Sequence, residues 1–277
     1  MNAQTAGAAA RYLRSRRPGG LVGRVRANAT AAFFVVSTAF APSLASSLPR
    51  IGVLIPAHNE EKSIALVLAE IPAGLVQEVV VVDNASTDHT AAAARAAGAT
   101  VVAEPRPGYG QACLAGLAYY AAQPAHQTPE IIVFLDGDHS DFPEEMPALL
   151  APLLSGAAEL VIGSRALGQR ERGALLPQQR FGNWLAAWLL RLRYGGTHTD
   201  LGPFRAIRAD ALARLGMADT NYGWTVEMQV KAARLRLRVA EVPVRYRRRI
   251  GTSKISGTVR GTLGAGYKIL WTIFKYW

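Results

Sequence analysis

The chain has 277 residues, half of them apolar, so it can bury a sizeable core in one large domain or two small ones. Its single cysteine, Cys113, excludes an intramolecular disulfide, and no Cys/His cluster has the spacing of a zinc site. The net charge of +11 lies at the two ends, because residues 51–230 hold 12 Lys and Arg against 19 acids and carry a net charge of −7. This distribution argues against a nucleic-acid groove and favours a domain whose basic ends lie against an anionic membrane, with unstructured basic tails as the alternative.

The N-terminal region is an arginine-rich stretch followed by 22 uncharged residues, 27–48. Its length would allow a signal or a membrane anchor, but its serines, threonines and proline make it more polar than an ordinary spanning helix. Basic residues ahead of a span also stay in the cytoplasm, which would export the domain that follows. We therefore expect residues 1–48 to form a basic, weakly ordered or surface-lying extension.

From residue 51 onward, segments typical of strands alternate with segments typical of helices. Short runs of apolar, often β-branched residues predict strands at 51–56, 79–82, 100–103, 131–135, 160–163 and 239–244. Helices are predicted at 60–71, 86–97, 111–120, directly after Asp141, 178–193 and 225–237. This alternation predicts an α/β fold with a mostly parallel sheet covered by helices on both faces, in a single domain spanning residues 49–250.

Two of these helices have clear start signals. We expect Asn59 to cap the first one, with Glu60 in its first turn, and Asp141 to cap the helix that carries Pro143 in its first turn. The apolar spacing of the first helix predicts a buried face of Ile64, Leu66, Val67, Leu68 and Ile71.

Polar clusters follow three of the predicted strands, at 57–60, 83–88 and 136–138. In open parallel sheets ligands bind at the carboxyl ends of the strands, and these clusters all fall on that edge. The third cluster is Asp136-Gly137-Asp138, whose two carboxylates can reach a common point because side chains two residues apart at a strand end share a direction. A hard divalent cation, Mg²⁺ or Mn²⁺, would offset their repulsion and bridge them to substrate phosphates. A plain polar turn is the alternative.

The C-terminal segment, residues 251–277, is amphipathic from Thr258 onward. Its apolar residues share one arc of a helix, whereas Arg260, Lys268 and Lys275 lie on the far side. This pattern is typical of a helix in a membrane interface, and packing on the domain's own core is the alternative.

Six segments resemble, in this order, motifs of the family-2 inverting glycosyltransferases with the GT-A fold: IPAHNEE at 55–61, VDNASTDHT at 82–90, LDGD at 135–138, GSR at 163–165, FR at 204–205 and RRIGTSK at 248–254. The later segments look most like the branch that acts on polyprenyl phosphates, similar to dolichyl-phosphate mannose synthase. The resemblance covers residues 50–256 and implies a Rossmann-like sheet followed by the C-terminal amphipathic helix.

The resemblance also implies a donor site. A nucleotide-sugar, of the UDP-glucose or GDP-mannose type, would contact Pro56, Ala57, Asn59, Glu60, Asp83 and Asn84. Asp136 and Asp138 would hold Mg²⁺ or Mn²⁺, which takes up the charge that develops on the departing diphosphate. Ser140 stands where relatives often have an amide ligand. Capping and turn formation are the alternative roles of Glu60 and Asp83.

For the acceptor, the resemblance implies a polyprenyl phosphate bound by Arg165 and Arg205, with Lys254 as a further phosphate contact. A phosphate monoester has a second pKa of about 6 and needs no strong general base at neutral pH. A hydroxyl acceptor would need one, and Asp200 is the carboxylate placed to serve, with a turn or a salt bridge as its alternative role.

These observations predict a metal-dependent hexosyltransferase that is peripheral on the cytoplasmic, inner face of the cell membrane. A non-lipid hydroxyl acceptor and a catalytically inactive membrane-docked scaffold are the alternatives. A nucleotidyltransferase would need a Gly-rich basic loop after the first strand, and a dehydrogenase a Gly-x-Gly-x-x-Gly motif, and the sequence has neither.

Overall fold

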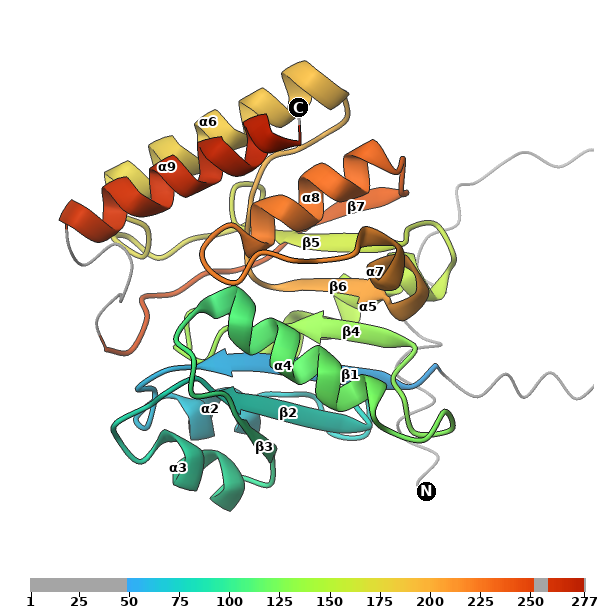
Figure 1. Cartoon of the computed structure of the whole chain (residues 1–277), viewed down its shortest axis with the longest axis vertical. Coiled ribbons are helices and arrows are strands. Elements are labelled where there is room, and N and C mark those ends of the chain that lie inside the picture. Colours follow the sequence, from blue (N-terminus) through green and yellow to red (C-terminus); the bar gives the residue numbers. More distant parts are fainter. Residues whose placement is uncertain (1–48, 252–258, 277) are drawn as a thin grey trace, which may run out of the picture. The chain divides into compact units, whose positions relative to one another are not determined.

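The described part of the chain is built on a seven-stranded sheet with helices on both faces (Figure 1). The computed structural model describes residues 49–251 and 259–276, so the expectations for residues 1–48 and for Lys254 concern residues outside these ranges. The strands are β1 (Ile51–Ala57), β2 (Glu78–Asp83), β3 (Thr100–Ala103), β4 (Ile131–Phe134), β5 (Leu160–Ser164), β6 (Arg205–Arg208) and β7 (Val239–Pro243). Their order is β3-β2-β1-β4-β6-β5-β7. Among the pairings of these strands, only those of β6 with β4 and β5 are antiparallel. The predicted mostly parallel sheet is therefore confirmed.

The strands are apolar because both faces of the sheet are covered. The described helices are α2 (Ile64–Ala69), α3 (Thr90–Ala96), α4 (Tyr109–Ala121), α5 (Met146–Leu154) preceded by the 3₁₀ turn η1 (Pro143–Glu145), α6 (Pro177–Tyr194), α7 (Ala209–Leu215), α8 (Trp224–Arg234) and α9 (Val259–Lys275). Side chains alternate along β1, so Val53 and Ile55 pack with α2, α3 and α5 while Leu54 packs with α4 and α8. Cys113 is buried in the second of these cores, as expected of a packing residue.

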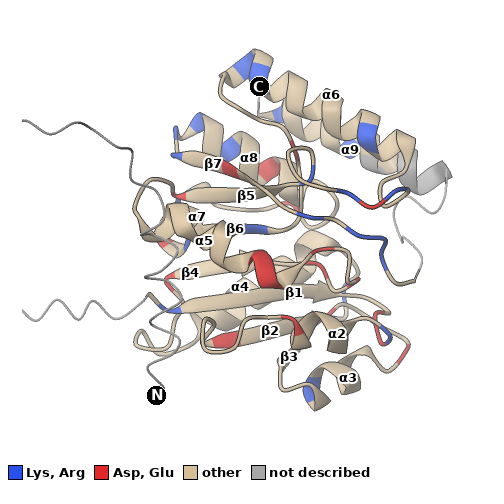
Figure 2. Cartoon of the chain, turned by 180° about the vertical axis from the view of Figure 1, so that it is seen from behind, with Lys and Arg blue, Asp and Glu red and all other residues tan. Residues whose placement is uncertain are grey.

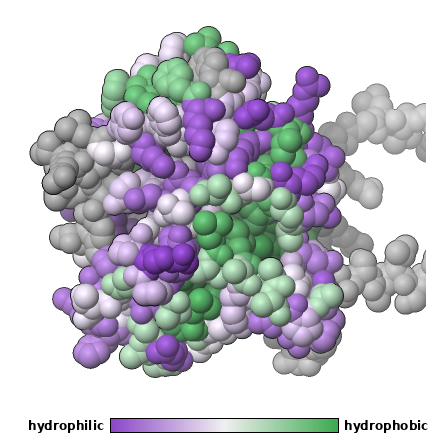
Figure 3. Space-filling view, viewed as in Figure 1, coloured by the Kyte–Doolittle hydropathy of each residue, from purple (hydrophilic) through white to green (hydrophobic). Residues whose placement is uncertain are grey.

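A third layer lies outside the sheet and consists of α6, α8 and α9. Leu190, Val230 and Ile273 bury one face of each helix, and α6 and α9 lie side by side (Figure 1). The outer faces keep large exposed side chains, namely Phe181, Trp184, Trp188 and Leu192 on α6 and Tyr267, Trp271 and Phe274 on α9. Figure 3 shows apolar side chains over these helices at the top of the view, and Figure 2 shows basic residues along them.

The amphipathic C-terminal helix is therefore present, and part of its apolar face packs on the domain. Ile273 of the predicted apolar arc is fully buried, whereas Phe274 of the same arc is exposed. Among the described residues, none of the helices combines the length and the apolar content that crossing a membrane would require.

Three local expectations are wrong. The helix α2 begins only at Ile64, and Asn59 adopts a positive φ of 54° and does not cap it. Leu66 of the expected buried face is 46% exposed, because the shorter helix presents that side to solvent. Asp141 is buried ahead of η1, whose N-cap residue is Phe142. In addition, α7 follows β6 directly and was not expected from the sequence.

Candidate active site

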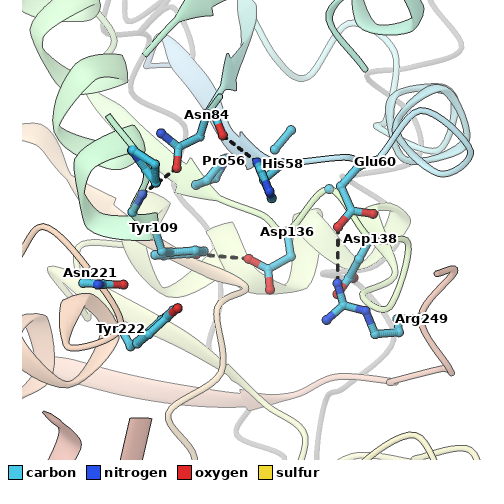
Figure 4. Close-up of a pocket in the computed structure, with 14 residues that line it drawn as sticks. Pro56, His58, Glu60, Asn84, Tyr109, Asp136, Asp138, Asn221, Tyr222 and Arg249 are labelled. Carbon is cyan, nitrogen blue, oxygen red and sulfur yellow. Dashed lines mark hydrogen bonds and ion pairs between the residues drawn. The ribbon is translucent and has the colours of Figure 1, made fainter. Parts of the chain in front are cut away.

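A cavity of about 400 Å³ opens at the carboxyl ends of β1, β2 and β4, the edge at which the three polar clusters were expected (Figure 4). Its lining includes six of the expected site residues, namely Pro56, Ala57, Glu60, Asn84, Asp136 and Asp138. The remaining lining residues are His58, Pro107, Gly108, Tyr109, Gly137, Asn221, Tyr222 and Arg249. Asn59, in the loop after β1, and Asp83, the last residue of β2, do not line the cavity.

Asn84 fixes the loops on the β1–β2 side of the cavity. Its side-chain amide donates to the carbonyls of Glu104 (3.1 Å) and Arg106 (2.7 Å), and its Oδ1 accepts a hydrogen bond from the Gly108 amide (2.8 Å). Its own carbonyl lies 2.7 Å from His58 Nδ1. Because these bonds join the loops after β1, β2 and β3, they hold one wall of the cavity in place.

Asn59 has a related structural role. Its Oδ1 accepts a hydrogen bond from the Thr87 amide at 2.8 Å, and its own amide donates to Ser86 Oγ at 3.0 Å. The left-handed backbone of Asn59 allows both contacts, since asparagine tolerates this conformation better than most residues. Asn59 thus links the loops after β1 and β2, and its contact with a donor stays a prediction.

The two carboxylates of the Asp-Gly-Asp motif both face the cavity (Figure 4). Asp136 Oδ1 accepts a hydrogen bond from the Tyr109 hydroxyl at 3.1 Å. Asp138 Oδ1 accepts from the Ser140 amide and hydroxyl, at 2.9 and 2.5 Å. Burial, and next the neighbouring Asp138 charge, raise the pKa of Asp136 to about 7. The site therefore gathers more negative charge than its own hydrogen bonds offset.

Arg249 supplies positive charge at this point. Its Nη2 lies 3.2 Å from Asp138 Oδ2 and 3.3 Å from Glu60 Oε1, so one guanidinium bridges the loops after β1 and β4 (Figure 4). The Ser140 hydroxyl, at the position where the resemblance implied an amide ligand, donates a hydrogen bond to Asp138. Glu60 thus contacts the Arg249 guanidinium at the cavity, and its backbone carbonyl accepts from the Ser63 and Ile64 amides at the start of α2.

The residues present fit a divalent cation that shares its coordination with a ligand. Within the described residues, no group of three or more His, Cys, Asp or Glu side chains has the arrangement of a metal site. Mg²⁺, however, is commonly held by one or two carboxylates together with substrate phosphates. Asp136 and Asp138 match that donor set, and a cation beside them would relieve the repulsion that raises the pKa of Asp136.

Asp141 lies beneath this site, buried, and neither of its carboxyl oxygens has a hydrogen-bond partner among the described residues. Burial, followed by the charges of Asp136 and Asp138, raises its pKa well above the ordinary value. Asp141 is thus a buried acid with a raised pKa, and the helical segment that it was expected to cap begins after it, with Phe142 as the N-cap residue of η1.

Arg165 and Asp200 form a buried ion pair with each other. Asp200 is 1% exposed and accepts from the Arg165 amide (2.6 Å), Nε (2.9 Å) and Nη2 (2.6 Å). Although burial raises the pKa of Asp200, the Arg165 guanidinium holds it below its usual range. In this arrangement Asp200 is a weak base, and the Arg165 donors that it binds are not directed to an acceptor phosphate.

Arg205 is 0% exposed, and its guanidinium donates to the carbonyls of Leu201 (3.1 Å), Gly202 and Thr225 (2.9 Å). Burial lowers its pKa to about 10. In this structure the side chain supports the loop that contains Asp200, and the expected contact with an acceptor phosphate stays a prediction.

Sequence reasoning missed Tyr109, Arg249, Asn221 and Tyr222 as lining residues. Arg249 belongs to the RRIGTSK segment, which contributed to the family resemblance, but no residue of this segment was expected at the donor site. Tyr109 lies between Gly108 and Gly110, and this Gly-x-Gly step at the start of α4 was the available sign of a close backbone approach. No pattern marked Asn221 and Tyr222, which come from the connection between α7 and α8.

Comparison with known proteins gives concordant results. The model of the family described as Glycosyl transferase family 2 matches residues 52–216. The chain is similar to an uncharacterized glycosyltransferase of Mycobacterium tuberculosis, with 42% identity over 213 residues, covering 76% of this chain and 92% of that protein. It is also similar to the undecaprenyl-phosphate mannosyltransferase of Micrococcus luteus, with 32% identity over 224 residues, covering 76% of this chain and 90% of that protein.

A solved structure is similar as well. It is the glucosyl-3-phosphoglycerate synthase of Mycobacterium tuberculosis in complex with Mn²⁺, UDP-glucose and phosphoglyceric acid. The TM-score is 0.65 at 26% identity, with 82% of this chain and 79% of that chain covered.

Proposed function

Because the chain belongs to glycosyl transferase family 2 and has the GT-A fold, we propose that it transfers a hexose, with inversion, from a nucleotide-sugar to a polyprenyl phosphate. The observation that carries the donor half is the pair Asp136 and Asp138 at the cavity, with an Asp136 pKa raised to about 7. A divalent cation would offset the repulsion between two carboxylates this close together. The diphosphate of a nucleotide-sugar would complete the coordination of that cation.

The protein's own residues divide the work at the donor. Asp136 and Asp138 would hold Mg²⁺ or Mn²⁺, Tyr109 orients Asp136 through its hydroxyl, and Arg249 brings a further positive charge to the leaving-group side. When bound, the metal supplies Lewis-acid stabilisation of the departing diphosphate. Pro56, Ala57 and Asn84 shape the end of the cavity proposed for the nucleoside, and the structural neighbour with UDP-glucose and Mn²⁺ supports this class of donor.

The pairing of Asp200 with Arg165 supports a phosphate acceptor over a hydroxyl. A hydroxyl nucleophile needs a general base, and Asp200 is committed to the Arg165 guanidinium with a lowered pKa. A phosphate monoester, whose second pKa is about 6, is already largely a dianion at neutral pH. The name of the Micrococcus luteus relative supports a lipid-linked phosphate of the same kind.

A second cavity, of about 630 Å³, adds support for such an acceptor. It is lined by Arg170, Arg180 and Arg191 together with Phe181 and Trp184 of α6. Arginines suit a phosphate, and the exposed aromatic rings suit an isoprenoid chain. Ala166 and Thr199, the chain neighbours of the Arg165–Asp200 pair, also line it. We place the acceptor on this side of the domain and the enzyme on the inner face of the cell membrane.

The test is a transfer assay with UDP-glucose and GDP-mannose, each with Mn²⁺ or Mg²⁺. Three acceptors are compared, a short-chain polyprenyl phosphate, the matching polyprenol and 3-phosphoglycerate. We expect product only from the polyprenyl phosphate, and a loss of about 100-fold or more with chelator or in Asp138→Asn.

Asp210→Asn is the matched control, because Asp210 is an exposed acid on α7. Transfer that survives both the chelator and Asp138→Asn would remove the metal from the proposal. Transfer to the polyprenol or to 3-phosphoglycerate, without transfer to the polyprenyl phosphate, would contradict the proposed acceptor.

A further inference from the structure

The connection between α7 and α8, residues 216–223, forms one wall of the candidate active site. Asn221 and Tyr222 line the cavity on the side opposite His58 and Glu60 (Figure 4). The Gly110 and Gln111 amides of α4 donate to the carbonyls of Asn221 (3.3 Å) and Thr220 (2.9 Å). The connection is thus tied to the helix whose first residue, Tyr109, binds Asp136.

Two carboxylates shape this connection from inside. Asp219 Oδ1 accepts hydrogen bonds from the amides of Asn221 (2.8 Å) and Gly223 (3.1 Å). Glu227, which is buried, accepts from the amides of Ala218 and Asp219 at 3.1 and 2.8 Å. The path of the backbone that carries Asn221 and Tyr222 therefore depends on where these two carboxylates are held.

The C-terminal helix α9 and Tyr276, the residue directly after it, contact the two carboxylates. Lys268 Nζ lies 2.9 Å from Asp219 Oδ2, and the Asp219 side chain is 8% exposed. The Tyr276 hydroxyl donates to Glu227 Oε1 at 3.0 Å. Thr272 packs against Gly223 so closely that a Cβ added to that glycine would lie 2.8 Å from Thr272 Oγ1. A helix some fifty residues further along the chain thus completes the support of the site wall.

We propose that Lys268 is a positioning residue for the donor site, and that it acts by pairing with Asp219 and so fixing the connection that carries Asn221 and Tyr222. The inference rests on the proposed function in naming the ligand of that site as a nucleotide-sugar. The physical reason is that Asp219 is nearly buried. Without Lys268 its carboxylate is left without its cation, and it gains by turning toward water and releasing the Asn221 and Gly223 amides.

The experiment compares Lys268→Met, Lys268→Arg and Arg95→Met in the full-length protein. Arg95 is the control, because it is an exposed basic residue of α3, which packs on the face of the sheet opposite to α8. Hydrogen exchange of the peptide containing residues 218–223 is measured without any substrate. We expect exchange about 3- to 10-fold faster in Lys268→Met, with Lys268→Arg and Arg95→Met close to wild type.

Kinetics then separate positioning from simple support of the fold. In Lys268→Met we expect KM for the nucleotide-sugar to rise about 3- to 10-fold and the thermal midpoint to change little, and Lys268→Arg to restore KM. Unchanged exchange in Lys268→Met overturns the proposal, and so does faster exchange with an unchanged KM. Exchange needs no donor, so its result stands even if the wild-type protein transfers no sugar, an outcome that would contradict the proposed function alone.

Discussion

Asp136 lies at the end of β4, with the Tyr109 hydroxyl on one oxygen and a second carboxylate two residues along the chain. Burial and the Asp138 charge raise its pKa to about 7, so a proton would compete with the proposed metal ion for this side chain near neutral pH. The folded protein holds this proton more tightly than the unfolded chain does. The free energy of unfolding therefore falls as the pH rises toward 7, and the ionised carboxylate favours any cation that binds there.

We therefore predict that Mn²⁺ affinity rises with pH. Below the raised pKa, Asp136 must lose its proton to bind the ion, so the dissociation constant should fall about tenfold per pH unit up to pH 7 and level off above it. Calorimetric titration between pH 5.5 and 8.5 measures this, with Asp136→Asn as the variant that flattens the profile. A dissociation constant that is independent of pH in the wild type would contradict the assignment of Asp136 as a ligand.

Asp200 provides a second test at the same scale, because its structural and catalytic roles predict different results. Breaking a buried ion pair leaves Arg165 uncompensated, so Asp200→Asn should lower the free energy of unfolding by about 3–5 kcal/mol. Urea unfolding measures the change, and Asp210→Asn, at an exposed side chain of α7, should change it by less than about 0.5 kcal/mol. Full stability together with lost transfer would instead identify Asp200 as the general base.

At the scale of elements, the strands were the most predictable features. Segment 100–103 coincides with β3, and 51–56 falls one residue short of β1, because a run of apolar residues between covered faces leaves few alternatives to a buried strand. Helix starts were less predictable. Asn59 has the chemistry of a cap, yet Thr87 lies within its reach and competes for its side chain, and this contact depends on the folded sheet.

The start of α4 gives a prediction at this scale. A Cβ on Gly110 would lie 2.0 Å from the Asp219 carbonyl oxygen, so Gly110→Ala must push the 216–223 connection away from the helix. We expect a loss of about 1–3 kcal/mol in the free energy of unfolding. Gly182→Ala is the control, since nothing lies within 4 Å of its added Cβ in α6 and alanine favours a helix by about 1 kcal/mol. Equal stability of Gly110→Ala and the wild type would contradict the close packing.

At the scale of the whole molecule, sheet topology explains both what was predictable about the site and what was not. The sequence alone predicted that the clusters after β1, β2 and β4 lie close together, because the carboxyl ends of adjacent parallel strands share an edge. Arg249 and Tyr222 reach the same cavity from segments that lie far along the chain, and no local pattern encodes that approach. The same limit applies to Arg205, whose sequence context matches a phosphate site but whose side chain is buried among carbonyls.

The exposed aromatic residues on the outer faces of α6 and α9 make the proposed membrane contact testable. They include the stacked pairs Trp184–Trp188 and Tyr267–Trp271, which suit the interface of a bilayer. We expect binding to vesicles that contain anionic phospholipid, weakened about 10-fold by the double substitution Trp271→Ser and Phe274→Ser. Sedimentation with vesicles measures this, and Leu66→Ser on the exposed side of α2 is the control. Equal binding of the double variant and the wild type would contradict this surface.

The most direct test of the central claim is calorimetric binding of UDP and GDP to the wild type and to Asp138→Asn, with Mn²⁺ and with chelator. If Asp136 and Asp138 hold the ion that binds the donor diphosphate, one nucleotide should bind the wild type with Mn²⁺, and binding should weaken at least about tenfold with chelator or in Asp138→Asn. Binding of equal strength in all of these conditions would contradict the account.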